Sequence, residues 1–253
     1  CLSGFILAYL YWGEEDCISV SKRKFWLARF LRIYPIHILV MVPTVYFVLD
    51  YRLAEESSLM FLLASLLSTL SLTQAWVPQF VPMWSWPTWT LSALIFLNLV
   101  MPLIVRLLAK LSKKQQQILL YIMPVISLVP TLIYAWLFPQ GSEPGMNWTI
   151  FISSMPIFWL PHFIAGMLLS RVCGIRRSNM QWRIEQPRSS FSVGDIALLA
   201  VIGIACIPGS GEEPIKYFFR HGLMMPLYLL IILDLARHRG ISARLFSLAG
   251  VGF

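Results

Sequence analysis

The sequence contains few charged residues, and fewer acidic than basic ones. Only 13% of its 253 residues are charged, with 20 Lys and Arg against 12 Asp and Glu, whereas 58% are hydrophobic. The mean hydropathy is +0.71. Soluble domains carry about 25% charged residues. This shortage of charge excludes an ordinary water-soluble domain and indicates an all-α membrane protein that crosses the bilayer several times.

Several patterns that define functional classes are also absent. The four cysteines form no Cys-x-x-Cys pair and no metal-ligand spacing, so we expect no metal and no bound cofactor. The basic residues form no continuous stripe with aromatic residues, which argues against nucleic acid as a partner. No internal repeat is visible, so the pattern gives no support to a transporter built from inverted repeats. A serine nucleophile is not expected either, because no Gly-x-Ser-x-Gly motif is present.

The basic residues that are present follow a clear pattern. Seventeen of the 20 fall in four clusters, and long apolar stretches separate the clusters. Because basic loops stay on the cytoplasmic side, the clusters predict the orientation of the chain and the side on which an anionic substrate is met. Cys17 and Cys173 lie in these loops, so we expect free thiols in a reducing compartment. The clusters are Lys22–Arg32, Arg106–Lys114, Arg171–Arg188 and Arg237–Arg244.

Seven apolar segments are candidates for membrane helices, and most approach the about 20 residues that a crossing needs. If all seven cross, the basic clusters fall on both sides of the membrane. If Leu59–Val77 is re-entrant, all four clusters are cytoplasmic, and its Ser, Thr and Gln side chains suit a segment buried in protein or lining a wet cavity. The alternative is a spanning helix in a protein that breaks the charge rule. The segments are Ile33–Leu49, Leu59–Val77, Trp86–Val105, Ile118–Phe138, Met146–Ser170, Ile196–Gly211 and Tyr217–Leu233.

Both ends of the sequence lie inside apolar runs. The first residue is Cys1, and the last, Phe253, ends a run that begins near Leu245. Neither end has the features of a natural terminus or a cleaved signal peptide. We therefore expect residues 1–253 to form a single membrane domain that is truncated at both ends and lacks its first and last helices.

Arg29 and Arg32 are the first candidates for substrate binding, together with Lys24 in the same cluster. The two arginines are three residues apart, so on a helix they share a face at the membrane boundary. Two guanidinium groups there suit the phosphates of a nucleotide-bearing donor. The alternative is a purely topological role, because arginine near a helix end extends its guanidinium group to the lipid headgroups.

Four motifs follow one another along the chain. They are Leu2-Ser3-Gly4-Phe5 followed by the basic block that ends at Tyr34-Pro35; Trp89-Thr90-Leu91-Ser92 with Met101-Pro102; Leu160-Pro161-x-Phe163-x-x-Gly166-Met167; and Leu245 to Gly250. In this order and spacing they resemble the integral-membrane acyltransferase-three family, whose members acylate sugars of surface polysaccharides, antibiotics and related acceptors.

The resemblance implies a bacterial inner-membrane enzyme that uses acyl-CoA, acetyl-CoA in particular, as a co-substrate. The donor would enter from the cytoplasm against Arg29, Arg32 and Lys24, and the acyl group would pass to a hydroxyl of a carbohydrate or lipid-linked glycan. Membrane lipid is the other expected partner.

The sequence also departs from the family. Leu94 and His162 stand where the family usually or often has Glu, and the helix that carries the family's presumed catalytic His would precede Cys1. We therefore expect the general base upstream and this stretch alone to be inactive. The rival is a transporter or permease of the same architecture, which the lack of Glu at Leu94 favours.

Candidate cavity residues are polar or aromatic side chains in or beside the apolar segments. His162 is the catalytic candidate, because imidazole can carry a proton near neutral pH, although a hydrogen-bonded core histidine is the alternative there and at His37. The tryptophans at the start of the third segment fit an interfacial aromatic belt or a platform for a sugar ring. The predicted acceptor or cavity residues are Ser3, Trp86, Trp89, Ser92 and His221.

The re-entrant model predicts the sidedness of two positions. Cysteines introduced at Ser57 and Gln79 of the intact protein are expected to react with an impermeant maleimide from the same side, because Leu59–Val77 enters and leaves there. The measurement compares labelling of intact and permeabilised cells. Labelling from opposite sides would contradict the model.

Overall fold

The computed structural model describes residues 1–13, 17–54, 58–137, 146–175, 191–206, 222–237 and 241. Within these ranges the regular structure is helical and contains no strand, so the all-α prediction is confirmed. Three stretches are long and apolar enough to cross a membrane: Lys22–Leu49, Trp86–Ala109 and Lys113–Leu137. The helices group into two compact units.

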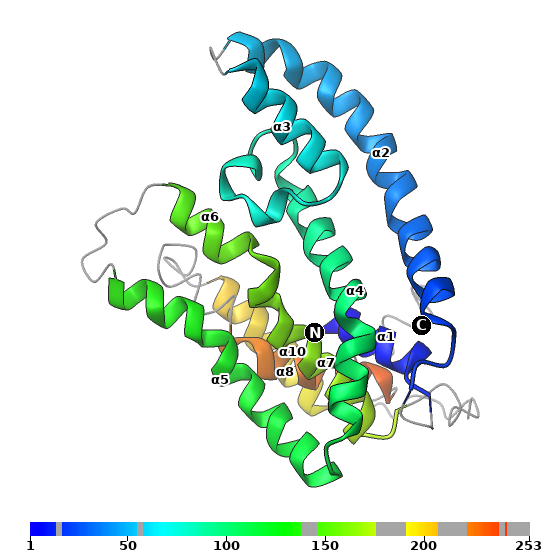
Figure 1. Cartoon of the computed structure of the whole chain (residues 1–253). Coiled ribbons are helices and arrows are strands. Elements are labelled where there is room, and N and C mark those ends of the chain that lie inside the picture. The colour runs from blue at the N-terminus through cyan, green and yellow to red at the C-terminus, as the bar shows by residue number, and fades with distance from the viewer. Residues whose placement is uncertain are drawn as a thin grey trace. The chain divides into compact units, whose positions relative to one another are not determined.

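Unit 2 contains residues 15–106 and 142–160. Two long helices frame it, and a short helix followed by an irregular segment connects them (Figure 1). The elements are α2 (Lys22–Ala54), α3 (Leu59–Leu70), the 3₁₀ turns η1 (Gln74–Trp76), η2 (Pro78–Phe80) and η3 (Trp86–Thr88), most of α4 (Trp89–Ala109), α6 (Met146–Ser154) and η4 (Pro156–Trp159).

The basic cluster Lys22–Arg32 is not a loop, so that part of the sequence prediction is wrong. It forms the first three turns of α2, which continues for 33 residues through Pro35 and Pro43. Ser21 precedes the helix and its Oγ accepts the Lys24 N–H at 3.4 Å. Lys, Arg, Leu and Ala are all good helix formers, so a basic run can be helical wherever nothing breaks it.

The α3 helix is short and ends in a tight turn. Its 12 residues rise about 18 Å, less than the about 30 Å of a hydrocarbon core. Leu72 then has a φ of +58°, and the N–H groups of Leu72 and Thr73 donate to the carbonyls of Thr69 and Ser68 at 3.1 and 2.9 Å. This is a Schellman motif with leucine where glycine is usual. Leu59–Val77 is therefore not one continuous helix, and which side of the membrane its ends face stays a prediction.

Side chains anchor the irregular segment that follows α3. Near the end of α2, Arg52 donates through Nε to the carbonyl of Met83 at 2.7 Å and through Nη2 to that of Pro82 at 2.8 Å. The indole N–H of Trp84 donates to Ser65 Oγ at 3.0 Å. The two Arg52 bonds satisfy backbone carbonyls outside the helices, as an apolar surrounding requires, and the Trp84 bond fixes the segment to α3.

Unit 1 contains residues 1–14, 107–141 and 161–253. A buried apolar cluster joins four of its helices and includes Phe5, Met123, Leu169 and Met225. The elements are α1 (Leu2–Tyr11), α5 (Lys113–Leu137), α7 (Leu160–Val172), α8 (Val193–Ala205) and α10 (Met225–Ala236).

The apolar segment Met146–Ser170, predicted as one piece, divides into α6, η4 and α7. Met155, immediately before Pro156, has φ −57° and ψ 120°, outside the helical region. The proline ring disfavours helical backbone at the residue that precedes it, so α6 ends there. His162 consequently lies in the first turn of α7 and not deep within a long helix.

Carboxylates fix the start of α8. Ser192 and Asp195 form a capping box, and Asp195 Oδ2 also accepts the N–H of Ile241 at 2.9 Å. Asp234 on α10 accepts the Gly194 N–H at 2.5 Å. Acidic groups at a helix N-terminus satisfy exposed N–H groups and match the helix dipole. These bonds hold α8 against α10.

Two glycines permit α1 and α7 to pack backbone to backbone. A Cβ at Gly4 would overlap the carbonyl oxygen of Phe163, and a Cβ at Gly166 would lie 2.8 Å from the amide nitrogen of Phe5. Both obstacles are main-chain atoms, which cannot rotate away. The close contact therefore depends on glycine at both positions.

Gly4→Ala is expected to lower the free energy of unfolding by about 1–3 kcal/mol, because its methyl group forces the two helices apart. The matched control is Gly203→Ala on α8, where an added Cβ meets nothing within 4 Å. That change should stabilise by up to about 1 kcal/mol through helix propensity. Thermal unfolding of the purified variants measures both, and equal effects would show that the α1–α7 contact is dispensable.

Candidate functional site

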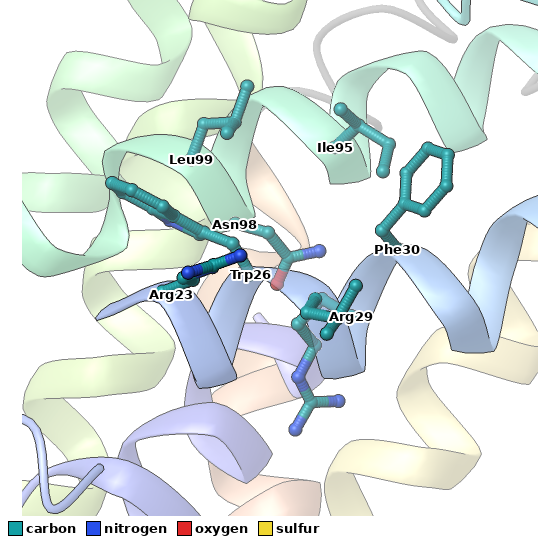
Figure 2. Close-up of a pocket in the computed structure, with 8 residues that line it drawn as sticks. Arg23, Trp26, Arg29, Phe30, Ile95, Asn98 and Leu99 are labelled. Carbon is teal, nitrogen blue, oxygen red and sulfur yellow. The ribbon is translucent and has the colours of Figure 1, made fainter. Parts of the chain in front are cut away.

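A pocket of about 330 Å³ lies between α2 and α4 within unit 2 (Figure 2). Its lining surface is almost entirely apolar, although two arginines and one asparagine contribute to it beside two aromatic and three aliphatic side chains. The lining residues are Arg23, Trp26, Leu27, Arg29 and Phe30 from α2 and Ile95, Asn98 and Leu99 from α4.

Arg29 lies about one turn after buried Phe25 on α2 and is itself partly buried. Its guanidinium carbon lies 5.9 Å from the centre of the Phe25 ring, within the range of a cation–π contact. Figure 2 shows the guanidinium group directed away from Asn98, so the aliphatic part of the side chain faces the pocket.

Asn98 is the polar residue that α4 contributes to the pocket. Its side chain is 6% exposed, and its Oδ1 atom has no hydrogen-bond partner among the described residues. Figure 2 shows the carboxamide directed from α4 toward α2, beside Arg29. An unpaired buried carbonyl oxygen is costly, so the site favours a ligand that supplies an N–H or O–H group there.

The pocket therefore suits a largely apolar ligand segment. Arg23 and Arg29 line it mainly through their aliphatic parts, and their guanidinium groups can pair with an anionic group beside it. Trp26 and Phe30 provide apolar surface for a flexible arm, and Asn98 provides a hydrogen-bond acceptor.

The structure separates the residues that the sequence grouped for donor binding. Arg29 lines the pocket, whereas Lys24 and Arg32 are exposed and lie outside its lining. Arg23 and Asn98 were missed. A signal existed for Asn98, because a lone carboxamide within an uncharged apolar segment is costly and marks an interior position.

The predicted cavity residues are distributed over both units. In unit 2, Trp86 is 50% exposed, whereas Trp89 is buried with its ring 5.6 Å from that of Trp159. Ser92 is 1% exposed, and its hydroxyl has no partner among the described residues. Of these three, only Trp86 offers an open aromatic face.

In unit 1, Ser3 is half-buried on α1, and His162 is 5% exposed on α7. His162 directly precedes Phe163, whose carbonyl faces Gly4, so the close α1–α7 contact also fixes the position of the imidazole. His221 lies outside the described residues.

The cysteines carry no disulfide in the described part of the chain, where Cys1, Cys17, Cys173 and Cys206 are free thiols. Burial raises the pKa of the Cys173 thiol, and the positive charge of Arg237 partly offsets this effect. A buried thiol with a raised pKa is a poor nucleophile, which makes Cys173 a structural residue.

Long apolar helices define a helical integral-membrane protein, and two of them border a largely apolar pocket. Residues 1–251 match the acyltransferase domain of the acyltransferase-3 family, and the chain belongs to this family. The resemblance seen in the sequence motifs is thereby confirmed.

The chain is 29% identical over 182 residues to the acyltransferase MdmB of Streptomyces mycarofaciens. This alignment covers 68% of the present chain and 44% of that protein, so the chain spans less than half the length of this curated relative. No solved structure matches the chain.

His162→Gln in the full-length protein is expected to preserve the fold, because an amide can still hydrogen-bond, but to lower turnover if the imidazole carries a proton in the reaction. Initial rates and thermal unfolding of the same preparation separate the two roles. An unchanged rate with an altered unfolding temperature would identify His162 as a core residue.

Proposed function

We propose that the chain is the membrane part of an O-acyltransferase. It transfers an acyl group, acetyl in particular, from a cytoplasmic acyl-CoA donor to a hydroxyl of a carbohydrate or lipid-linked glycan. The observation that carries the proposal is the pocket between α2 and α4, in a chain that belongs to an acyltransferase family.

The pocket matches the chemistry of a CoA thioester. The guanidinium groups of Arg23 and Arg29 pair with phosphate oxygens, which are anionic and accept hydrogen bonds. The pantetheine arm is a flexible chain with amide N–H groups, and it packs on Trp26 and Phe30 while Asn98 Oδ1 accepts one of those hydrogens. These contacts orient the thioester along the pocket between α2 and α4.

The transfer is a substitution at the thioester carbonyl. The acceptor hydroxyl oxygen attacks the carbonyl carbon, the new C–O bond forms, and the C–S bond breaks. The CoA thiolate leaves, and the proton of the hydroxyl passes to a general base and finally to this thiolate, which becomes the thiol. The products are an ester and free CoA, with no other reactant.

The proposal also covers the acceptor and the orientation of the protein in the membrane. The half-exposed ring of Trp86 can pack on the C–H surface of a sugar, and the charge pattern favours cytoplasmic basic segments in a bacterial inner membrane. The donor then approaches from the cytoplasm, which is where acyl-CoA occurs.

The direct test uses the full-length protein in membranes that contain its native acceptor. Radiolabelled acetyl-CoA is added, and label that mild base releases from a glycan fraction is counted as ester-linked product. The expected result is label that depends on the protein and is lost when the full-length gene is deleted. Absence of ester-linked label would favour the permease alternative.

Arg29→Ala is expected to raise the donor KM by about 10- to 100-fold, because it removes a charge-assisted hydrogen bond worth about 1.5–3 kcal/mol. Arg29→Lys should rescue only partly, because an ammonium group lacks the planar fork. Arg32→Ala, outside the pocket, should have the smaller effect. Steady-state kinetics with acetyl-CoA measure the difference, and full activity of Arg29→Lys would assign this arginine to topology alone.

A further inference from the structure

Three polar side chains of unit 2 are fully buried and hold atoms without a hydrogen-bond partner among the described residues. Gln74 is 0% exposed, and both its amide nitrogen and its carbonyl oxygen are unpartnered. Ser92 and His37 are each 1% exposed, and the Ser92 Oγ and His37 Nδ1 atoms are unpartnered. In an apolar surrounding each such atom costs free energy unless a ligand or a bound water pairs with it.

Packing of η1 on α4 brings Gln74 to the level of Ser92. Ala75 shares a buried cluster with Trp89, and the Trp76 ring lies 5.1 Å from that of Phe96. Trp89, Ser92 and Phe96 occupy one face of α4, because they are spaced by three and four residues. The 3₁₀ turn that begins with Gln74 therefore runs along the part of α4 that carries the Ser92 hydroxyl.

His37 ties α2 to the turn that leads into Gln74. Its Nε2 atom lies 3.0 Å from the carbonyl oxygen of Thr69, which also accepts the N–H of Leu72 in the Schellman motif. A carbonyl only accepts, so Nε2 carries the hydrogen, and Nδ1 of the neutral imidazole is a hydrogen-bond acceptor. The left-handed Leu72 in this turn ends the run of α3, and the chain continues into η1.

The unpartnered atoms define the chemistry of the ligand. His37 Nδ1 and the Gln74 carbonyl oxygen accept, the Gln74 amide nitrogen donates, and the Ser92 hydroxyl does both. A carboxylate or phosphate would face two acceptors, and an ammonium group would leave the donor unpaired. Hydroxyl groups donate and accept at once, so a neutral compound with neighbouring hydroxyls satisfies all four atoms.

We propose that Gln74, Ser92 and His37 form a binding site for the hydroxyl-bearing acceptor, in the interior between α2, η1 and α4. The site rests on the proposed acyl transfer and assigns Gln74 and His37 as acceptor-binding residues. The same two helices, α2 and α4, carry residues of this site and of the donor pocket. Along α2, His37 follows Arg29 by eight residues, and along α4, Ser92 precedes Asn98 by six.

The test uses the full-length protein in nanodiscs, with octyl β-D-glucoside below its micelle concentration as the acceptor probe. Gln74→Leu is expected to raise the KM for the probe about tenfold or more, because two hydrogen bonds are lost, and to leave the KM for acetyl-CoA unchanged. The matched control is Gln79→Leu, five residues further along the same segment on an exposed side chain, which should change neither constant.

Stability distinguishes binding from a structural role. Removing an unpaired buried amide should leave the unfolding temperature of Gln74→Leu unchanged or higher. A lower unfolding temperature with an unchanged KM for the probe would overturn the proposal, and so would equal KM values in the two glutamine variants. Ser92→Ala, a nearly isosteric change, provides a second variant that should fold and should also raise the KM for the probe.

A binding measurement keeps this inference separate from the proposed transfer. Octyl β-D-glucoside should raise the unfolding temperature of the wild-type protein and of Gln79→Leu, and not that of Gln74→Leu. If this pattern holds while no acetylated glucoside forms, the acceptor site stands and the proposed transfer fails. If the probe does not stabilise the wild-type protein, the acceptor site is overturned.

Discussion

The requirement that polar groups be satisfied away from water governs this structure more than any single contact. In hydrocarbon, the backbone meets this requirement only as helix, and irregular chain needs side chains to satisfy its carbonyls. Arg52 does so for Pro82 and Met83, and His37 adds a second bond to the Thr69 carbonyl at the end of α3. Because these bonds are made inside unit 2, the irregular segment between α3 and α4 can place Gln74 in the interior.

Much of this arrangement follows from the sequence, and the failures have local causes. The composition predicts the helical membrane class, and the lengths of the apolar segments predict the long helices. Both predictions depend on sums over many residues and not on the position of any single one. Proline does not act as a uniform signal: α2 continues through Pro35, whereas α6 ends before Pro156. The outcome depends on whether neighbouring helices can satisfy the freed carbonyl, which is a tertiary property.

The residues of the candidate site also depend on tertiary packing, which sequence spacing alone does not predict. Spacing places Arg29 and Arg32 near one another on a helix, but the two are about 60° apart around its axis. Only Arg29 lines the pocket, yet helical angle alone does not single it out, because Arg29 lies about 40° and Arg32 about 20° from Phe25 around the axis. Gln74 was indicated only as part of the polar content of Leu59–Val77, because a segment of turns has no hydrophobic period that distinguishes single residues.

The length of α2 has a consequence for how the protein depends on its lipid. Its 33 residues extend about 50 Å, about 20 Å more than a hydrocarbon core of about 30 Å. A helix of this length tilts to match the bilayer, and the tilt changes the depth of Arg23 and Arg29 in its first three turns. The thickness of the bilayer, which depends on the length of the lipid acyl chains, therefore determines the depth of the pocket between α2 and α4 relative to the headgroups.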